Sequence, residues 1–216
     1  MRSPRPGWPT ANIGSDLQDR SAFAPQDYPS RTKIPIVTDP FSGRAIGAFR
    51  PLTPDLAAIH VTLADPLGNC IMLGTEWSRF ELSRAAKRVV VVADAIVHTD
   101  CMRQYPNLVR IPDIVVDAVV YWPFAAWPQS SPGMYDLDEA HMKLMNEALA
   151  TDQGTAAYIR DYVESYRDVE SYLDLIGRDR CKTLQASSTS FLLDPYRQWI
   201  IPATDIAPLQ TVNASA

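Results

Sequence analysis

The chain has 216 residues, 46% hydrophobic and 21% charged, which is long enough to bury the core of one ordinary α/β domain. Its 25 acidic residues outnumber its 20 basic ones and give a net charge of -5, which argues against a nucleic-acid partner. No apolar run approaches the ~20 residues of a membrane-spanning helix, and no apolar segment follows the basic N-terminus as in a secretory signal, so we expect no membrane partner either.

The first 54 residues are predicted to be extended and looping, because nine of the eighteen prolines lie there. Turn signals occur at Asp39-Pro40 and at Ser42-Gly43. A long irregular stretch rarely opens a self-sufficient domain. We therefore expect residues 1–54 to wrap over another chain, or over a sheet whose first strands are supplied elsewhere.

Apolar runs then alternate with helical spacings and predict an α/β fold. Strands are expected at residues 56–64, 70–73, 89–92 and 114–121, and helices at 76–87 and 99–104. Because strand, helix and strand alternate, the sheet is expected to be parallel, with helices on both faces.

The C-terminal region is predicted to be helical. Apolar residues recur at helical spacing over 138–150, 152–165 and 169–176, and Gly177 is a usual helix stop. Residues 202–216 are small and polar and are expected to fray. We expect three parts: the extended segment 1–54, an α/β domain with C-terminal helices over 55–180, and a tail over 181–216.

Cysteines and histidines give no sign of a metal site. The cysteines Cys70, Cys101 and Cys181 are odd in number and widely spaced, which is typical of reduced thiols in a cytoplasmic protein. No two histidines have metal-ligand spacing. His60 lies in an apolar strand and is interpreted as a satisfied core imidazole, whereas His98 and His141 are expected to be solvated.

Two carboxylates stand next to predicted strands. Asp117 interrupts an apolar strand, and we favour a structural anchor over a catalytic role for it. Asp65 opens a turn that contains Gly68 and Asn69 and follows a parallel strand, where ligands bind in such sheets. Turn chemistry alone also explains these three residues, so both interpretations stay open.

The loop after the last strand is a candidate binding element. Ser130, Ser131, Gly133 and Tyr135 present hydroxyl and backbone N–H groups suited to an anionic ligand. The sequence has no Gly-x-Ser-x-Gly elbow, no Gly-x-Gly-x-x-Gly and no phosphate-binding Gly-Lys-Ser/Thr loop. A serine hydrolase, a hydride-transfer enzyme and a nucleotide-driven enzyme are therefore disfavoured.

Five ordered segments carry a family resemblance. They are DPFSG at 39–43, PDLAAIHVTLADPLGN at 54–69, AAKRV at 85–89 with DAIV at 94–97, IPDIVVDAVV at 111–120, and WPFAAWPQSSPGMYD at 122–136. Each resembles the corresponding segment of the A subunits of glutaconate-type, family I CoA-transferases. The segments lie between residues 39 and 136, and the resemblance is taken to extend over about residues 14–165.

This resemblance implies one chain of a heteromeric CoA-transferase that moves CoA between an acyl-CoA and a carboxylic acid. A glutamate of a B-type partner chain would attack the thioester. The CoA thioester is then a substrate, and no permanently bound cofactor is expected. Two alternatives remain: a ring-cleaving hydrolase or decarboxylase of CoA thioesters on the same scaffold, and a non-catalytic structural subunit.

The resemblance also implies a set of site residues and shows departures from the family. The substrate-binding candidates are Asp65, Gly68, Asn69, Trp127, Ser130, Ser131 and Tyr135. Trp127 stands where the family has a histidine, and it would reshape the acyl pocket or cover a partner surface. The family's nucleophile motif is absent, with Glu76 as its nearest imitation. The family's N-terminal strands and Gly-rich loop have no counterpart, so we expect a further chain to supply them or a shortened subunit.

Overall fold

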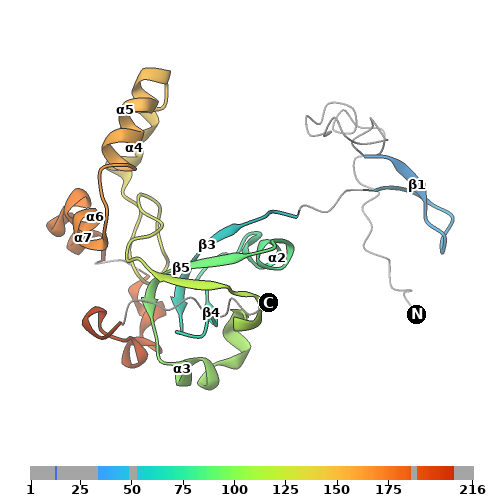
Figure 1. Ribbon diagram of the computed structural model, residues 1–216, viewed down its shortest axis with the longest axis horizontal. Coiled ribbons are helices and arrows are strands. Elements are labelled where there is room, and N and C mark those ends of the chain that lie inside the picture. The colour runs from blue at the N-terminus through green and yellow to red at the C-terminus, as the bar shows by residue number, and fades with distance from the viewer. Residues whose placement is uncertain (1–12, 14–33, 49–52, 186–188, 207–216) are drawn as a thin grey trace. The chain divides into compact units, whose positions relative to one another are not determined.

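The computed structural model describes residues 13, 34–48, 53–185 and 189–206 (Figure 1). The chain divides into two compact units, Met1–Leu52 and Thr53–Ala216, each of which we describe by itself. No helix among the described residues is long and apolar enough to cross a membrane.

In the first unit the described residues form a short antiparallel hairpin. Strand β1, Ile36–Thr38, pairs with β2, Ala45–Gly47. In the connecting turn the Asp39 carboxylate accepts the backbone N–H groups of Phe41 and Ser42 at 3.1 and 3.2 Å. The predicted turn is therefore confirmed, although it joins two strands instead of interrupting a loop. Most of the predicted N-terminal segment lies outside the described residues.

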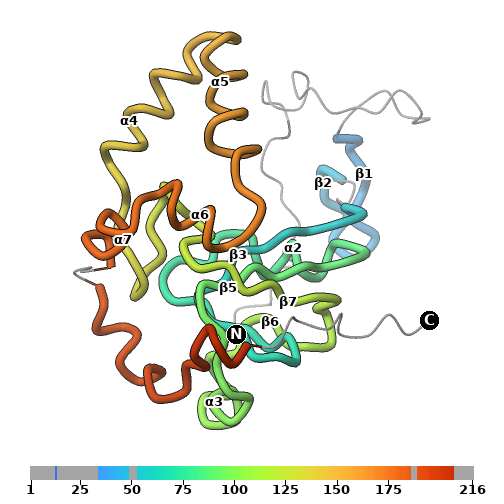
Figure 2. Tube along the Cα trace, turned by 60° about the vertical axis from the view of Figure 1, so that its left-hand side comes forward, coloured from blue at the N-terminus to red at the C-terminus, as the bar shows by residue number. Residues whose placement is uncertain are grey.

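The second unit is built on a five-stranded sheet with the order β6-β4-β3-β5-β7, in which Figure 1 labels β3, β4 and β5 and Figure 2 labels β6 and β7. β3 pairs in parallel with β5, and β5 with β7, whereas β4 is antiparallel to both of its neighbours. The predicted α/β class with a mostly parallel sheet is thus confirmed, and β4 is reversed because a tight turn joins it to β3. The strands are β3 (Ala57–Ala64), β4 (Cys70–Ile71), β5 (Val89–Ile96), β6 (Val109–Ile111) and β7 (Ala118–Tyr121).

The helices between the strands are short. Helix α2 spans Arg79–Ala85, within the longer helix predicted there, and α3 spans Thr99–Gln104 as predicted. Single 3-10 turns, η1 (Pro106–Leu108) and η2 (Asp113–Val115), precede β6 and β7.

The last strand begins later than the apolar run predicted. Residues that were expected to open this strand form η2, and β7 starts only after Asp117. The Asp117 carboxylate accepts the backbone N–H of Val89 at 2.6 Å, at the start of the neighbouring strand. Its interpretation as a structural anchor is confirmed.

One side of the sheet is fully buried and the other is only partly covered. Side chains alternate along a strand, so Ile59 and Val61 point away from Ala58 and His60. Ile59 and Val61 are 2% and 0% exposed, whereas Ala58 is exposed and His60 half-buried. β5 begins with the same alternation. The sheet therefore offers a half-open side on which further elements pack.

Four helices follow β7: α4 (Glu139–Ala148), α5 (Asp152–Tyr162), α6 (Val169–Ile176) and α7 (Arg178–Gln185). α4 and α5 lie side by side and project from the sheet, and neither contains a buried residue (Figures 1 and 2). α6 has the predicted bounds and ends at Gly177, whose φ of 95° favours glycine. α6 and α7 pack on the loop after β7 through Tyr172, Ile176, Cys181 and Leu184.

Residues 189–206 return to the sheet as three 3-10 turns, η3 (Ser190–Leu193), η4 (Arg197–Trp199) and η5 (Ala203–Asp205). Ile200 bridges to Val97 just beyond β5. The described part of the predicted tail is thus packed on the core. The expected fraying over 202–216 falls mostly outside the described residues, and the three-part division of the chain stays a prediction.

Candidate functional site

A buried carboxylate near the end of β5 holds the loop that follows β7. Asp94 is 1% exposed. It accepts hydrogen bonds from the backbone N–H of Ala125 at 3.1 Å and from the hydroxyl of Tyr135 at 3.0 Å, and Nε2 of His60 lies 2.7 Å away. A buried carboxylate is costly unless it is hydrogen-bonded, so these contacts stabilise Asp94 and the loop together.

Tyr135, a predicted ligand-binding residue, is buried inside the loop. Its hydroxyl donates to Asp94 and accepts the backbone N–H of Ala126 at 2.8 Å, and its ring stacks on Phe124 with the centroids 4.4 Å apart. Burial, followed by the Asp94 charge, raises the pKa of Tyr135 far above its ordinary value. The phenol therefore stays a neutral donor that fixes the shape of the loop.

His60 is a core imidazole with one unpaired nitrogen. Its Nε2 meets Asp94, as expected for a satisfied imidazole. Its Nδ1 is buried and has no hydrogen-bond partner among the described residues. The sequence-based interpretation thus holds for one of the two ring nitrogens.

The two serines of the loop have different environments. Ser130 is exposed. Ser131 is 0% exposed, and its backbone exchanges two hydrogen bonds of 3.0 Å with Tyr135, which closes the loop. The buried Ser131 hydroxyl has no partner among the residues that the structure describes. Of the two predicted hydroxyls, that of Ser130 is the one open to solvent.

Trp127 joins the loop to the first C-terminal helix. Its Nε1 donates to the Asp138 carboxylate at 3.1 Å, and its ring lies 3.9 Å from that of His141. Asp138 also pairs with Arg180, which together with the other donors lowers the pKa of Asp138 to about 2.

The prediction of a solvated His141 is wrong. His141 packs on Trp127, its Nε2 lies 2.9 Å from the Tyr158 hydroxyl, and burial lowers the pKa of His141. His98 is exposed, as predicted.

A groove of about 400 Å³ lies between this loop, the half-open side of the sheet and helices α5 and α6. Val92 and Val120 line it from the strands, and Ala125, whose N–H is held by Asp94, lines it from the loop. None of its eleven lining residues is charged. Six of them are aromatic: Trp122, Trp127, Tyr158, Tyr162, Tyr166 and Tyr172.

The predicted Asp65, Gly68 and Asn69 form a tight turn that lies outside this groove. One Asp65 oxygen accepts the backbone N–H groups of Gly68 and Asn69 at 2.9 and 2.8 Å. Gly68 has a φ of 106°, and a Cβ there would lie 3.0 Å from Val116. None of the three lines the groove. Turn formation accounts for these residues, and their ligand-binding role stays a prediction.

Glu76 is separate as well. It forms a two-point ion pair with Arg110, with N···O distances of 2.6 and 3.0 Å. It is not among the residues that line the groove. An ion-paired carboxylate outside the groove is a poor nucleophile for a ligand bound there.

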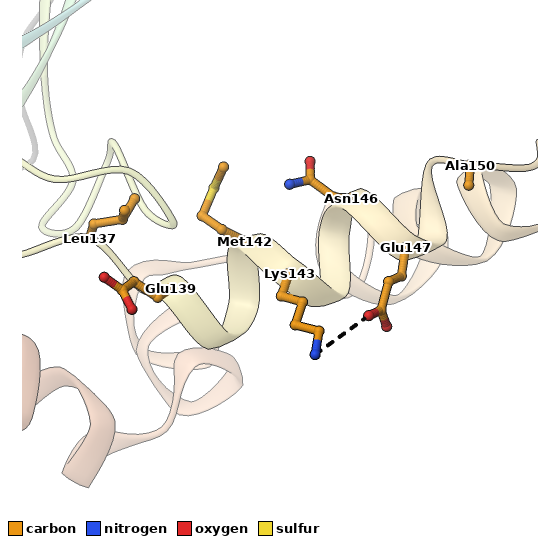
Figure 3. A pocket seen from close by; sticks show the side chains of 7 residues that line it. All are labelled: Leu137, Glu139, Met142, Lys143, Asn146, Glu147 and Ala150. Atoms are coloured by element: carbon orange, nitrogen blue, oxygen red, sulfur yellow. Dashed lines mark ion pairs between the residues drawn. The ribbon is translucent and has the colours of Figure 1, made fainter.

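A second hollow, of about 610 Å³, runs along one face of α4 (Figure 3). Its residues come from α4 and the segments next to it, and Lys143 and Glu147 pair within it at 4.0 Å. Among the described residues no group of three or more His, Cys, Asp or Glu is placed to hold a metal ion.

Sequence reasoning noted Asp94 only as part of the DAIV segment at 94–97, and it missed the burial of this carboxylate, its pairing with His60 and the aromatic groove. An acidic residue inside an apolar strand was the available signal at Asp94, and the same signal was used correctly for Asp117. The aromatic residues of α5 follow no motif and converge with Trp122 only through the fold.

No protein-family model matches the chain. It is 37% identical over 147 residues, 68% of its length, to an uncharacterised protein of Archaeoglobus fulgidus, of which this match covers 33%. It is 28% identical over 178 residues to the A subunit of the glutaconate CoA-transferase of Acidaminococcus fermentans, over 80% of this chain and 56% of that one. It is also 28% identical over 153 residues to the A subunit of the 3-oxoadipate CoA-transferase of Pseudomonas knackmussii, over 70% and 53%.

Among solved structures, the glutaconate coenzyme A-transferase of Acidaminococcus fermentans superposes with a TM-score of 0.67 and 26% identity, over 81% of this chain and 53% of that chain. The chain thus spans between a third and just over half of the length of the relatives it matches. The predicted resemblance and fold are confirmed.

Proposed function

Because the chain is a homologue of the A subunits of the glutaconate and 3-oxoadipate CoA-transferases and has the fold of the former, we propose that it is the A-type chain of a two-chain CoA-transferase. The observation that carries this proposal is the structural match over 81% of the chain. The enzyme would move CoA between an acyl-CoA and a carboxylic acid in the cytoplasm, without a permanently bound cofactor.

The nucleophile in this proposal is a glutamate of the B-type partner. Its carboxylate attacks the thioester carbonyl, the C–S bond breaks, and an acyl-glutamyl anhydride and a CoA thiolate form. The thiolate then attacks the glutamyl carbonyl and releases the first acid, which leaves a glutamyl-CoA thioester. The second acid reverses both steps and departs as its CoA ester.

This chain would contribute the wall of the acyl site. The loop after β7 is held by Asp94 and Tyr135 before any ligand arrives, and its residues Ala125 and Trp127 form one side of the groove. A wall fixed in advance lowers the entropic cost of holding the acyl group for attack. The ion pair of Glu76 with Arg110 supports a nucleophile from another chain.

The test is mass spectrometry of the chain co-purified with a B-type partner and incubated with acyl-CoA. A CoA-sized mass increase on the B-type partner, removed by borohydride reduction of the thioester, is the expected result. The same increase on this chain would instead assign the nucleophile here. A stable complex with no covalent CoA on either chain would refute the transferase proposal in favour of hydrolysis or decarboxylation. Failure to form a complex would refute the two-chain arrangement.

A further inference from the structure

We propose that the groove binds the acyl group of the CoA thioester, and that this group contains a hydrophobic ring and lacks a second carboxylate. The thioester part of this statement rests on the proposed function. The ring and the missing carboxylate rest on the lining of the groove.

The lining is unsuited to a dicarboxylic acyl group such as the names of two relatives indicate. A second carboxylate buried in the groove would need a cation or several donors, since an unpaired buried charge is strongly destabilising. None of the lining residues is charged, and two of the donors among them are already used: Trp127 Nε1 donates to Asp138 and the Tyr172 hydroxyl donates to the backbone carbonyl of Phe124. The guanidinium of Arg180 does not line the groove and is already paired with Asp138, which also accepts the Trp127 Nε1–H.

The same lining is suited to a ring. The aromatic side chains meet at several angles. Trp122 and Tyr172 are tilted, with centroids 5.5 Å apart and planes at 46°, and Trp127 and Tyr172 meet edge-on at 6.4 Å and 80°. Tyr158 and Tyr162 stack at 4.9 Å and 29°. Such an arrangement presents both ring faces and ring edges to the groove. A planar or saturated ring gains dispersion and stacking contacts with both.

The volume of the groove matches an acyl group and not a whole CoA ester. About 400 Å³ lies near the lower end of the range of ~300–1,000 Å³ for small-molecule sites. With no cation in the lining, the groove also offers nothing to the phosphates of CoA. The nucleotide part of the thioester therefore lies outside the groove.

The rim of the groove is open to solvent. Val120 on β7 is 36% exposed, and Val163 at the C-cap of α5 is 52% exposed. The groove is thus an accessible site, unlike a filled core, and Val163 can be replaced without disturbing buried packing.

The test compares the binding of benzoyl-CoA, glutaryl-CoA and free CoA by titration calorimetry, with the chain alone and with its B-type complex. We expect benzoyl-CoA to bind about tenfold or more tightly than glutaryl-CoA, because only the ring buries apolar surface in the groove. Equal binding of the two esters, or tighter binding of glutaryl-CoA, would overturn the proposal. Complex formation that abolishes benzoyl-CoA binding would also overturn it, since the partner would then occupy the groove.

Val163→Lys places a cation at the rim of the groove. It should shift the ratio of the dissociation constants of the two esters by about tenfold in favour of glutaryl-CoA. Ile159→Lys is the matched control: this residue is 42% exposed on the same helix and does not line the groove. The same change in preference in both variants would refute a role of the groove.

Binding needs no turnover, so the two proposals fail separately. Ring-selective binding without CoA transfer would refute the proposed function and keep the groove assignment. CoA transfer from glutaryl-CoA without ring selectivity would do the reverse.

Discussion

Two connections leave the same edge of the sheet, at the carboxyl ends of parallel strands, and they are stabilised in different ways. The turn after β3 contains Asp65, whose carboxylate bonds to residues two to four positions further along the chain. The loop after β7 depends on Asp94 of the neighbouring strand, which is 31 positions from Ala125 and 41 from Tyr135. The first connection is a local motif, whereas the second exists only when the sheet has formed.

This difference bears on where a binding site can be built. A turn whose carboxylate is taken up by its own backbone offers little to a partner or ligand, so the Asp65 turn serves mainly to reverse the chain into β4. A loop whose backbone is held by a buried carboxylate of a neighbouring strand can leave its outward-facing side chains available for ligand contacts. Three residues of the loop after β7 accordingly line the groove: Trp122, Ala125 and Trp127.

The largest effect is expected for Asp94→Ala. It removes the acceptor of two buried donors and the partner of His60, which should destabilise the chain by roughly 3–5 kcal/mol and release the loop. Urea unfolding measures the stability, and titration with benzoyl-CoA measures the groove. Where the alanine variant does not fold, Asp94→Asn provides a milder test in the same direction.

Asp65→Ala is the control that tests the comparison itself. It should cost about 1–2 kcal/mol, in the range of a lost cap, and leave benzoyl-CoA binding by the folded protein unchanged. Equal losses of binding in both variants would show that the two connections do not differ in the way proposed.

An intermediate effect is expected from pH through Asp138, which anchors the outer side of the loop through Trp127. Its pKa is lowered from 3.8 to about 2, so the stabilisation is present above pH ~4 and is lost as the pH falls towards 2. It amounts to about 2 kcal/mol for a shift of this size. Acid unfolding of Asp138→Asn should lack this contribution, whereas Asp161→Asn, in an exposed pair, should behave as the unchanged protein.

How far the sequence predicts each region follows from the same contrast. The Asp65 turn, the parallel direction of β3, β5 and β7 and helix α6 could be inferred because their signals are local: turn residues, apolar runs that alternate with helical spacings, and a Gly177 stop. The pairing of Asp94 with Tyr135 and the packing of His141 on Trp127 involve residues far apart in the chain or in separate elements. No periodicity or spacing encodes such contacts, so the loop was found as a motif but its support was not.

A smaller effect is expected for Tyr135→Phe. The ring stays stacked on Phe124, but the Ala126 N–H loses its acceptor and Asp94 loses one donor. We expect a loss of about 1–2 kcal/mol in unfolding free energy, together with weaker benzoyl-CoA binding. Tyr105→Phe, outside the loop, is the control and should leave binding unchanged. Unchanged binding in Tyr135→Phe would mean that the hydroxyl does not set the shape of the groove.

The smallest effect on stability and on CoA transfer is expected for Glu76→Gln, although Glu76 is the residue of this chain that most resembles the family's nucleophile. The pair with Arg110 is partly exposed, with 28% of the Glu76 side chain accessible, so its loss should cost below about 1 kcal/mol. Glutamine retains the size of the side chain, and CoA transfer by the two-chain complex should continue at a similar rate if the nucleophile lies on the partner. Loss of transfer together with unchanged unfolding and unchanged benzoyl-CoA binding would identify Glu76 as the attacking carboxylate. Because Glu76 does not line the groove, that outcome would place the attacked acyl carbonyl elsewhere and would contradict the assignment of the groove to the acyl group.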